Sequence, residues 1–526
     1  MVKVSDFIFL LILAKPILSE SLKELIEFYQ GHYYSASVLG LVDLLKLEQE
    51  FMENFTIYTD ALQEKVDNLN NYLDALKRPN HTTHNEREKF VSDPLNAFGL
   101  IRRLNQDWPK WQNYAQKSVG LVQINAMEKI LSKKPKLFDM NESLRSMHRI
   151  EVTYDLSAKD IARGVLQSTQ FNYTLSVGDC LALANHTLEI GNLNSSLQWF
   201  QEAVKQFPDN YEDISSSLKE DQLKEFATVV ATRRIQMMNQ SLGNETLHKL
   251  VRNQLQNLTK KDMENFISSK LVQWHRGSVS KLENANTQTT AHNIGCRGLF
   301  PKRKNLVCRY NSTTNAFLKL APLKMEEISR DPYIVMYHKV LSDREIEEMK
   351  GEVKEWSNGW TGLEEPMEIV SLVYWTTDES KFRDRINQRI SDMTGFKLEE
   401  FPALQLANFG IGGYFKPHYD YFTERLRTLD ANNTLGDRLG SLLFYAGEVS
   451  QGGQTVFPEV EVAVEPKKGN ALFWFNDFDD SSPDPRSLHS VCPVIIGSRW
   501  TITKWLHHDP QVFVKPCSPR ILKRSS

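Results

Sequence analysis

The residues best suited to chemistry stand late in the chain, in the segment GGYFKPHYDYF at positions 412–422. One residue separates His418 from Asp420, and in a β-strand the side chains at i and i+2 point to the same face. An imidazole and a carboxylate on one face can both bind a metal ion. The alternative is a solvated edge strand, and the metal interpretation requires a third ligand elsewhere in the chain.

The candidates for this third ligand are His489, His507 and His508. His489 leads into the strand-forming segment SVCPVIIGSRWTITKW, whereas the other two follow the last expected strand and are interpreted as surface residues. We therefore expect His418, Asp420 and His489 to form the metal site. Two imidazoles and one carboxylate cover one face of an octahedron and leave positions open, which suits non-haem Fe(II) and its reaction with O2.

A co-substrate is expected to fill part of the open face, and 2-oxoglutarate would do so through its 2-oxo acid end. Its far carboxylate then needs a cation, and the last expected strand carries Arg499 and Lys504. Alternation along a strand places Arg499 on the same face as Thr501 and Thr503 and opposite to the second cation. A guanidinium can hold a carboxylate with two hydrogen bonds. Arg499 is therefore expected to bind the far carboxylate, with one of the threonines assisting, and the alternative is a clamp formed by Lys504.

These residues lie in a region rich in β-forming segments, which begins at about residue 331. Short runs such as ALQLANF, GSLLFYAGE and NALFWFND alternate with turn residues, a pattern typical of a β-sandwich or barrel. Helical stretches are expected at 343–356 and 379–392. We therefore predict one β-rich domain that carries the whole metal site.

The N-terminal half is expected to be helical. Residues 21–77 carry an apolar seam at alternating three- and four-residue steps, which favours a coiled coil or helix bundle. The alternative is an ordinary amphipathic helix packed on its own domain. The seam consists of Phe55, Leu62, Val66, Leu69, Leu73 and Leu76. Residues 93–150 are also expected to be helical, beginning at Asp93-Pro94, a favourable helix start.

Residues 177–208 have the spacing of a tetratricopeptide repeat. Its apolar, small and terminating positions are occupied by Leu183, Ala184, Phe200, Ala203 and Pro208. The turn between the two helices is expected at Gly191-Asn192. One repeat cannot bury its own apolar face, and residues 219–256 are interpreted as a degraded second repeat. A helical hairpin without repeat ancestry is the alternative.

Length and charge set broad limits on the class of protein. A chain of 526 residues is expected to form about two to four domains. Its 63 basic and 66 acidic residues nearly balance, which gives no indication of binding to nucleic acid or to a strongly charged membrane. No segment after the N-terminus is apolar enough to predict a membrane span.

The N-terminus has the layout of a secretory signal peptide. A basic start precedes the apolar run Phe7 to Leu13, and small residues follow near Ser19, which gives a signal peptide of residues 1–19. A buried N-terminal helix is the alternative. The last residues, KRSS, do not form a retrieval signal of the K-D-E-L type, so retention in the endoplasmic reticulum would require another component.

Cysteines and glycosylation sequons also fit an exported protein. Proximity in sequence suggests the disulfides Cys296–Cys308 and Cys492–Cys517 and leaves Cys180 free, although four cysteines allow three pairings. Sequons of the N-x-S/T type are frequent, as expected for a glycoprotein in the lumen. They lie at Asn54, Asn80, Asn141, Asn172, Asn185, Asn194, Asn239, Asn244, Asn257, Asn311 and Asn432.

Several segments resemble collagen prolyl 4-hydroxylase α subunits. The segments LQLANFGIGGYFKPHYDYF, GGQTVFPEVEVAVEPKKGNALFWFN and HSVCPVIIGSRWTITKWLHH resemble the catalytic domain of that family. DPLNAFGLIRRLNQDW is similar to its N-terminal domain, and LSVGDCLALANHTLEIGN is similar to the start of its peptide-binding domain. CRGLFPKRKNLVCRY is similar to the disulfide loop that precedes the catalytic domain. The resemblance extends over nearly the whole chain.

The resemblance implies a jelly-roll dioxygenase that uses Fe(II), O2, 2-oxoglutarate and ascorbate. His418, Asp420 and His489 match the iron ligands of the family. Arg499 stands where the vertebrate enzymes have a lysine that binds 2-oxoglutarate, and Phe409 stands where many members have tyrosine. The resemblance also implies an α2β2 tetramer in the lumen of the endoplasmic reticulum, with protein disulfide isomerase as the β subunit. That partner would account for retention.

The complete prediction is a multidomain α+β protein with helical N-terminal domains and a C-terminal double-stranded β-helix. The predicted regions are a signal peptide (1–19), a helical dimerisation domain (20–150), a tetratricopeptide-like substrate-binding domain (151–270), a linker with a disulfide loop (271–330) and the dioxygenase domain (331–526). The expected reaction is hydroxylation of peptidyl proline at C4 in the X-Pro-Gly triplets of procollagen. The alternatives are the same oxidation of another proline-rich secretory protein, or a non-catalytic subunit that recruits the disulfide isomerase.

Overall fold

The computed structural model describes most of the chain and divides it into two compact units. The described residues are 33–76, 81–206, 224–225, 228, 290–353, 357–358, 371–377, 380–398, 403–422 and 436–516. One unit comprises residues 41–136, and the other comprises residues 1–40 together with 137–526. The predicted signal peptide and most of the predicted second repeat lie outside the described residues.

The unit of residues 41–136 is helical, as predicted. Its elements are α3 (Val38–Ala75, whose first turn belongs to the other unit), α4 (His84–Val91), α5 (Pro94–Arg102), a π-helical turn (Arg103–Asp107), α6 (Trp108–Gln116) and α7 (Leu121–Leu131). Helix α5 begins at the predicted residue because the Asp93 carboxylate accepts a hydrogen bond from Leu95 N and Pro94 needs no such partner.

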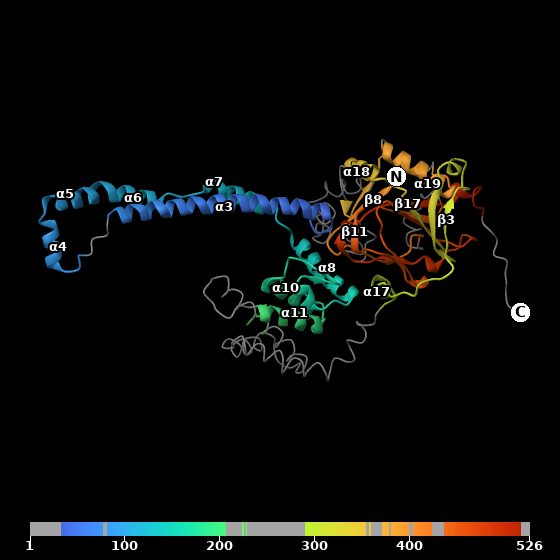
Figure 1. Cartoon of the computed structure of the whole chain (residues 1–526), viewed down its shortest axis with the longest axis horizontal. Helices are drawn as coiled ribbons and strands as arrows, with labels where there is room; N and C mark the ends of the chain where they lie inside the picture. Colours follow the sequence, from blue (N-terminus) through green and yellow to red (C-terminus); the bar gives the residue numbers. More distant parts are fainter. Residues whose placement is uncertain are drawn as a thin grey trace, which may run out of the picture. The chain divides into compact units, whose positions relative to one another are not determined.

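Helix α3 packs against α6 through a face other than the predicted seam. The two helices run side by side (Figure 1). Lys65 Nζ donates to the carbonyl of Ala115, and the ring of Tyr72 stacks on Trp111 at a centroid distance of 4.5 Å. Phe55 and Val66 of the seam remain 50% and 48% exposed. Leu69, Leu73 and Leu76 of the seam are half-buried, so the part of the seam from Phe55 to Val66 is the part that remains available to a partner helix.

The second unit begins with a small helical layer. It contains α8 (Leu137–Tyr154), α9 (Ala158–Ala162), the short strands β1 (Val165–Leu166) and β2 (Thr169–Gln170), α10 (Val177–Glu189) and α11 (Leu193–Gln206). Helices α10 and α11 pack closely as a hairpin, and Gly191 takes a left-handed φ of +84° at the predicted turn. The predicted core residues of the hairpin are all buried, namely Leu183, Ala184, Phe200 and Ala203. Pro208 lies outside the described residues.

The rest of this unit is built on antiparallel sheets. The large sheet has the order β3-β4-β5-β14-β10-β17-β8-β7-β6, a smaller sheet has the order β13-β12-β15-β9, and β11 pairs with β16. The strands are β3 (Cys308–Asn311), β4 (Leu323–Arg330), β5 (Tyr333–His338), β6 (Ser357–Asn358), β7 (Ser371–Trp375), β8 (Gln405–Phe409), β9 (Phe415–His418), β10 (Arg438–Tyr445), β11 (Val449–Gly452), β12 (Thr455–Phe457), β13 (Val462–Val464), β14 (Ala471–Phe475), β15 (His489–Val491), β16 (Val494–Gly497) and β17 (Trp500–His507).

The large sheet has a different covering on each face. Its helix-side face packs on α18 (Asp343–Glu352) and α19 (Lys381–Thr394), and this core includes Ile346, Ile386, Ile502 and Leu506. The opposite face packs on the small sheet through residues such as Tyr445, Phe457 and Trp474. The metal site predicted from sequence belongs to the small sheet and therefore lies on the face away from the helices.

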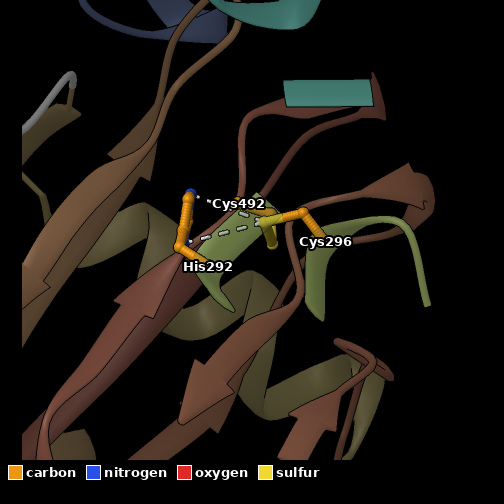
Figure 2. A group of neighbouring side chains, drawn as sticks. All are labelled: His292, Cys296 and Cys492. Carbon is orange, nitrogen blue, oxygen red and sulfur yellow. Dashed lines mark hydrogen bonds between the residues drawn. A yellow bond between two sulfur atoms is a disulfide. The ribbon is translucent and has the colours of Figure 1, made fainter. Parts of the chain in front are cut away.

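The predicted disulfide between Cys296 and Cys308 is wrong, because Cys296 is bonded to Cys492 (Figure 2). Helix α17 (Ala291–Cys296) packs on β12, and β12 pairs with β15, which ends one residue before Cys492. The two cysteines are therefore brought together by the tertiary fold across 196 residues of sequence. Cys308 begins the edge strand β3 as an exposed free thiol. The predicted pairing of Cys492 with Cys517 is also overturned, although Cys517 itself lies outside the described residues.

The structure describes only some of the residues on which the predictions about membrane spans and glycosylation depend. Among the described residues, no helix is long and apolar enough to cross a membrane. The sequons at Asn141, Asn172, Asn185 and Asn194 are exposed, and those at Asn54 and Asn311 are half-buried. Five sequons lie outside the described residues, namely Asn80, Asn239, Asn244, Asn257 and Asn432.

Candidate metal centre and co-substrate cation

The two histidines of the predicted triad are direct partners across a pair of antiparallel strands. His489, the first residue of β15, stands opposite His418, the last residue of β9. Asp420 lies in a bend beyond the strand, so strand alternation does not place it. Its two carboxylate oxygens are nevertheless 3.8 Å from His418 Nε2 and 3.7 Å from His489 Nε2. One ligand atom from each residue lies within 4.8 Å of the others, close enough to hold one metal ion.

Backbone carbonyls fix the orientation of both imidazoles. His418 Nδ1 lies 2.8 Å from the carbonyl oxygen of Lys416, and His489 Nδ1 lies 3.0 Å from that of Ser487. A carbonyl can only accept, so each Nδ1 carries the proton and each Nε2 presents a lone pair. Both lone pairs belong to the nitrogens nearest Asp420. This tautomer leaves Nε2 of each ring free to bind a metal, with Nδ1 held by an outer partner.

The pKa shifts of His418 and Asp420 both favour the protonation states that bind a cation. Burial and the neighbouring His489 lower the pKa of His418 to about 3, so its imidazole is neutral at physiological pH. Burial alone would raise the pKa of Asp420, but the two histidines, Arg438 and Ser441 together lower it. Two imidazoles and one carboxylate are therefore brought together, and they match the donor set of a non-haem Fe(II) site.

Two residues that the sequence did not indicate support the carboxylate. Ser441 on β10 donates a hydrogen bond of 2.5 Å to Asp420 Oδ2, and Arg438 donates to the Asp420 backbone carbonyl at 3.2 Å. Aromatic rings enclose the histidines as well. Phe415 stacks on His418 at 3.5 Å, and Trp474 lies 4.7 Å from His489. These rings pack directly against the two imidazoles.

Arg499 is the buried cation expected near this centre. It is 2% exposed, and its Nε donates to the carbonyl of Gly453 at 3.1 Å, while Nη2 donates to Thr455 Oγ1 at 3.4 Å. Its guanidinium also lies 4.6 Å from the ring of Phe409. In the part of the chain that the structure describes, no carboxylate forms an ion pair with it, and burial lowers its pKa to about 10. A buried guanidinium without a counter-charge is costly, so this position suits an anionic ligand.

Strand register relates Arg499 to the metal ligands. Its partner Thr455 stands opposite Val491, which follows His489 by two residues on the same strand. Residues two apart share a face, and paired residues of neighbouring antiparallel strands do so as well. Thr455 therefore lies on the face of His489, about 7 Å along the strand. A short dicarboxylate bound at the metal could reach the guanidinium over such a distance.

Lys504 lies on the other face of the large sheet. Its neighbours Ile502 and Leu506 belong to the core beneath α18 and α19. Burial, aided by the charge of Arg383 on α19, lowers the pKa of Lys504. The amine lies 3.4 Å from the carbonyl of Ala403. Alternation along the strand thus separates the two cations as predicted, and only Arg499 faces the small sheet.

The other candidates are placed away from the triad. His507 Nδ1 contacts the carbonyl of Gly436, and His508 pairs with Asp477 at 2.6 Å. The interpretation of His507 as a surface residue was wrong, since it is 9% exposed. Thr501, two residues after Arg499, is buried, yet the guanidinium bonds to Thr455 instead. The threonine on the facing strand could not be identified from the alternation within β17.

A second group of possible ligands is formed by His292, Cys296 and Cys492. Its sulfur atoms are joined in the disulfide, and His292 Nε2 lies 3.5 Å from Cys296 Sγ (Figure 2). Burial lowers the pKa of His292 to about 4, and its Nδ1 is 2.7 Å from Ser490 Oγ. Ser490 follows His489 directly, so this group attaches α17 to the strand that carries a metal ligand.

Comparison with known proteins agrees with this geometry. Residues 404–507, which contain the triad and Arg499, match the 2OG-Fe(II) oxygenase superfamily. The C-terminal part of the chain is therefore an oxygenase domain of that superfamily, which implies Fe(II), 2-oxoglutarate and O2. Residues 37–168 match the N-terminal region of the prolyl 4-hydroxylase alpha-subunit.

Most of the chain is also similar to prolyl 4-hydroxylase α subunits, which confirms the predicted resemblance. It is 29% identical to prolyl 4-hydroxylase subunit alpha-1 of Bos taurus over an alignment of 513 residues. This alignment covers 92% of this chain and 95% of the bovine protein. It is also 27% identical to prolyl 4-hydroxylase subunit alpha-2 of Caenorhabditis elegans over an alignment of 504 residues. This alignment covers 91% of this chain and 92% of the nematode protein. A viral collagen prolyl hydroxylase from Paramecium Bursaria Chlorella virus-1 is 23% identical in sequence, covers 33% of this chain and 96% of its own, and has a TM-score of 0.25.

Proposed function

We propose that this protein hydroxylates peptidyl proline at C4, with Fe(II) held by His418, Asp420 and His489 and the far carboxylate of 2-oxoglutarate held by Arg499. The observation that carries the proposal is a buried guanidinium without a carboxylate partner in the described structure, on the face of the sheet that presents the triad. Homology to prolyl 4-hydroxylase α subunits supplies the substrate class.

The bound iron supplies the redox chemistry by which O2, 2-oxoglutarate and a proline C–H bond give succinate, CO2 and 4-hydroxyproline. The protein supplies position. The carbonyls of Lys416 and Ser487 hold the two imidazoles, and Ser441 holds the carboxylate. Arg499 orients the co-substrate through its far end and offsets its charge. Phe415 and Trp474 pack against the two imidazoles and help to hold them in place.

Collagen-like peptide is the substrate that we propose. Hydroxyproline at the Y position of Gly-X-Y triplets is a regular constituent of the collagen triple helix, and the homologues are prolyl hydroxylase subunits. We assign peptide binding to the hairpin of α10 and α11 and interpret it as a tetratricopeptide-like repeat within a domain of residues 151–270. Oxidation of another proline-rich secretory protein is the competing assignment, motivated by the few aromatic residues between positions 210 and 270.

We extend the same proposal to fold, assembly and location. The paired antiparallel sheets of residues 331–526 are interpreted as a jelly-roll, and residues 271–330 as its linker. The exposed seam residues of α3 from Phe55 to Val66 suit a partner helix within a dimerisation domain of residues 20–150. The α2β2 assembly with protein disulfide isomerase, the lumen of the endoplasmic reticulum and N-linked glycans complete the proposal, supported by the predicted signal peptide and by the homologues.

The decisive experiment uses the chain co-expressed with protein disulfide isomerase. A (Pro-Pro-Gly)n peptide is incubated with Fe(II), 2-oxoglutarate, ascorbate and O2, and mass spectrometry locates any added oxygen. We expect hydroxylation at C4 of the proline before glycine, together with succinate. His418→Ala should abolish both products. His338→Ala, which removes an imidazole paired with Glu326 elsewhere in the same domain, serves as the matched control and should retain them.

The alternatives give different results in the same assay. Turnover of other proline-rich peptides but not of the collagen-like set would assign the competing substrate. A chain that assembles with the isomerase but decarboxylates no 2-oxoglutarate would be a non-catalytic subunit. Decarboxylation that persists in His418→Ala would refute the metal site itself.

A further inference from the structure

Tyr154 at the end of α8 forms an unusual link between the helical layer and the oxygenase sheets. Its side chain is 6% exposed, and its hydroxyl donates a hydrogen bond of 2.6 Å to the carbonyl of Pro493, 339 residues later in the chain. It packs in a small core with Ile150, Val456 and the Cys296–Cys492 disulfide. Neither the metal triad nor the hairpin of α10 and α11 accounts for this contact.

A short chain of hydrogen bonds connects Tyr154 to Arg499, the cation assigned to the co-substrate. The carbonyl of Pro493 also accepts the backbone N–H of Gly453 at 3.2 Å, and the carbonyl of Gly453 accepts Arg499 Nε at 3.1 Å. Burial raises the pKa of Tyr154, and a hydrogen bond with the Gly453 backbone opposes that rise. The tyrosine hydroxyl thus contacts the peptide unit on one side of Gly453, and Arg499 bonds to the peptide unit on its other side.

The turn between them depends on outside support. Gly452 and Gly453 have φ values of +78° and +69°, a left-handed conformation that glycine adopts readily but does not hold by itself. A Cβ on Gly452 would lie 2.9 Å from the Tyr154 hydroxyl and 2.4 Å from the Pro493 carbonyl, so the hydroxyl fits closely against this turn. Anchoring the turn to α8 therefore fixes the carbonyl that sets the direction of the guanidinium.

Helix α8 is itself held on the oxygenase sheets at a second point. Arg149 donates to the carbonyl of Gly412 at 2.9 Å, stacks over the ring of Tyr414 at 3.7 Å and pairs with Glu142 at 2.9 Å. Gly412 lies just before β9, the strand that ends at His418. The two anchors give α8 a fixed position from which Tyr154 can support the glycine turn.

We propose that Tyr154 is a positioning residue for 2-oxoglutarate, which acts by holding the Gly453 carbonyl that orients Arg499 toward the far carboxylate of the co-substrate. The proposal rests on the assignment of Arg499 above and adds a determinant from the N-terminal half of the chain. A misdirected guanidinium would bind the carboxylate with one hydrogen bond instead of two. The loss therefore concerns only ligands that possess the far carboxylate.

The test is Tyr154→Phe in the co-expressed assembly, which removes one oxygen and keeps the ring. We expect the KM for 2-oxoglutarate to rise about tenfold, as for the loss of one to two well-placed hydrogen bonds to a charged group. The KM for peptide and the affinity for the metal should stay within twofold of the parent. Affinity for 2-oxobutyrate, a 2-oxo acid without the far carboxylate, should not change.

Tyr337→Phe provides a matched control. Tyr337 is 4% exposed, and its hydroxyl donates to the carbonyl of Met393 on the helix side of the large sheet. Both variants should lose similar thermal stability, because each removes a buried tyrosine hydrogen bond to a carbonyl. Only Tyr154→Phe should affect 2-oxoglutarate. Equal KM values for 2-oxoglutarate in the two variants, or an equal effect of Tyr154→Phe on 2-oxobutyrate, would overturn the proposal.

Arg499→Ala separates this inference from the proposed function. If Arg499→Ala raises the KM for 2-oxoglutarate and Tyr154→Phe does not, the clamp stands and the role of Tyr154 fails. If Arg499→Ala has no effect, the assignment of the clamp itself fails. In the double variant, Tyr154→Phe should add nothing to the effect of Arg499→Ala, because the tyrosine acts through the guanidinium. Additive effects would contradict the proposal.

Discussion

His418 and His489 stand directly opposite one another on β9 and β15, although 70 intervening residues separate them in the sequence. Residues paired in this way have their side chains on one face and close together. The strand register therefore builds two thirds of the ligand set, and only the bend that carries Asp420 must be placed separately. Support for that bend should consequently control metal affinity.

Ser441 provides this support and gives the first prediction. Its hydroxyl is buried and donates to Asp420 Oδ2, so Ser441→Ala leaves the carboxylate less well oriented. We expect the affinity for Fe(II), or for Mn²⁺ as an air-stable probe, to fall about tenfold, as for other outer partners of metal ligands. Anaerobic metal titration measures it.

Ser329→Ala is the control for this substitution. Ser329, on β4 of the same large sheet, is equally buried, and its hydroxyl accepts a hydrogen bond from Arg303. A fall in metal affinity confined to Ser441→Ala supports the role of the serine. Unchanged affinity in Ser441→Ala would show that the bend is held by other contacts, such as the one from Arg438 to the Asp420 carbonyl.

The second prediction concerns the cost of the buried guanidinium. Arg499 carries its charge without a carboxylate partner in the described structure, so Arg499→Met should stabilise the ligand-free protein by about 1–3 kcal/mol. The same change removes the partner of 2-oxoglutarate. Differential scanning calorimetry should therefore show a higher Tm for Arg499→Met without ligand.

Addition of 2-oxoglutarate should then make the Tm of the parent higher than that of Arg499→Met. The metal-loaded parent should gain Tm steadily as 2-oxoglutarate is added, since ligand that binds only the native state stabilises it. The variant should gain little. A variant that is less stable than the parent without ligand, and that responds equally to 2-oxoglutarate, would show that Arg499 serves packing alone.

Local sequence rules were sufficient for the parts of the site that lie on single strands. Alternation along the predicted last strand separated Arg499, the residue just before β17, from Lys504 within β17, because the pleat sends neighbouring side chains to opposite faces whatever the rest of the fold. The helix start at Pro94 and the hairpin turn at Gly191 were likewise predictable, because capping and left-handed φ values are local properties.

Relationships between strands could not be read from the sequence. Thr455 and Ser441 reach the site only through the pairing of β12 with β15 and of β10 with its neighbours. The disulfide prediction failed for the same reason. It paired cysteines that are close in the sequence, whereas the fold brings Cys296 at the end of α17 to Cys492, the residue after β15. Contacts of this kind depend on tertiary register, which a single sequence does not reveal.

The third prediction uses the buried amine of Lys504. Burial, aided by the charge of Arg383, lowers its pKa to about 7 in the folded protein, whereas the pKa in the unfolded chain is about 10.4. Below pH 7 the amine is charged in both states and burial costs its full amount. Between pH 7 and 10 only the unfolded chain keeps the proton, so the free energy of unfolding rises with pH.

Lys504→Met removes this dependence. The variant should be more stable than the parent by about 2 kcal/mol at pH 6, and the difference should shrink toward zero by pH 10. Urea midpoints at several pH values measure it. Lys319→Met, at an exposed position, should leave both the midpoint and its pH dependence unchanged. A constant difference between Lys504→Met and the parent across this range would mean that the amine does not titrate there.

The fourth prediction tests the corrected disulfide and its connection to the metal ligands. Peptide mapping of the unreduced protein should recover Cys296 linked to Cys492. Iodoacetamide should modify the exposed Cys308 rapidly, whereas Cys180 should react only after unfolding, because burial raises its pKa to about 12. Recovery of Cys296 linked to Cys308 would contradict the structure.

Loss of this disulfide should also weaken the metal site. Cys492 lies three residues after His489, so the bond to α17 restrains the strand that carries this ligand. Cys296→Ser together with Cys492→Ser should cost about 2–5 kcal/mol of stability and lower metal affinity in the anaerobic titration. Cys308→Ser, a change at a free thiol, should do neither. Parent-like metal affinity in the double variant would show that strand pairing between β9 and β15 suffices to hold His489.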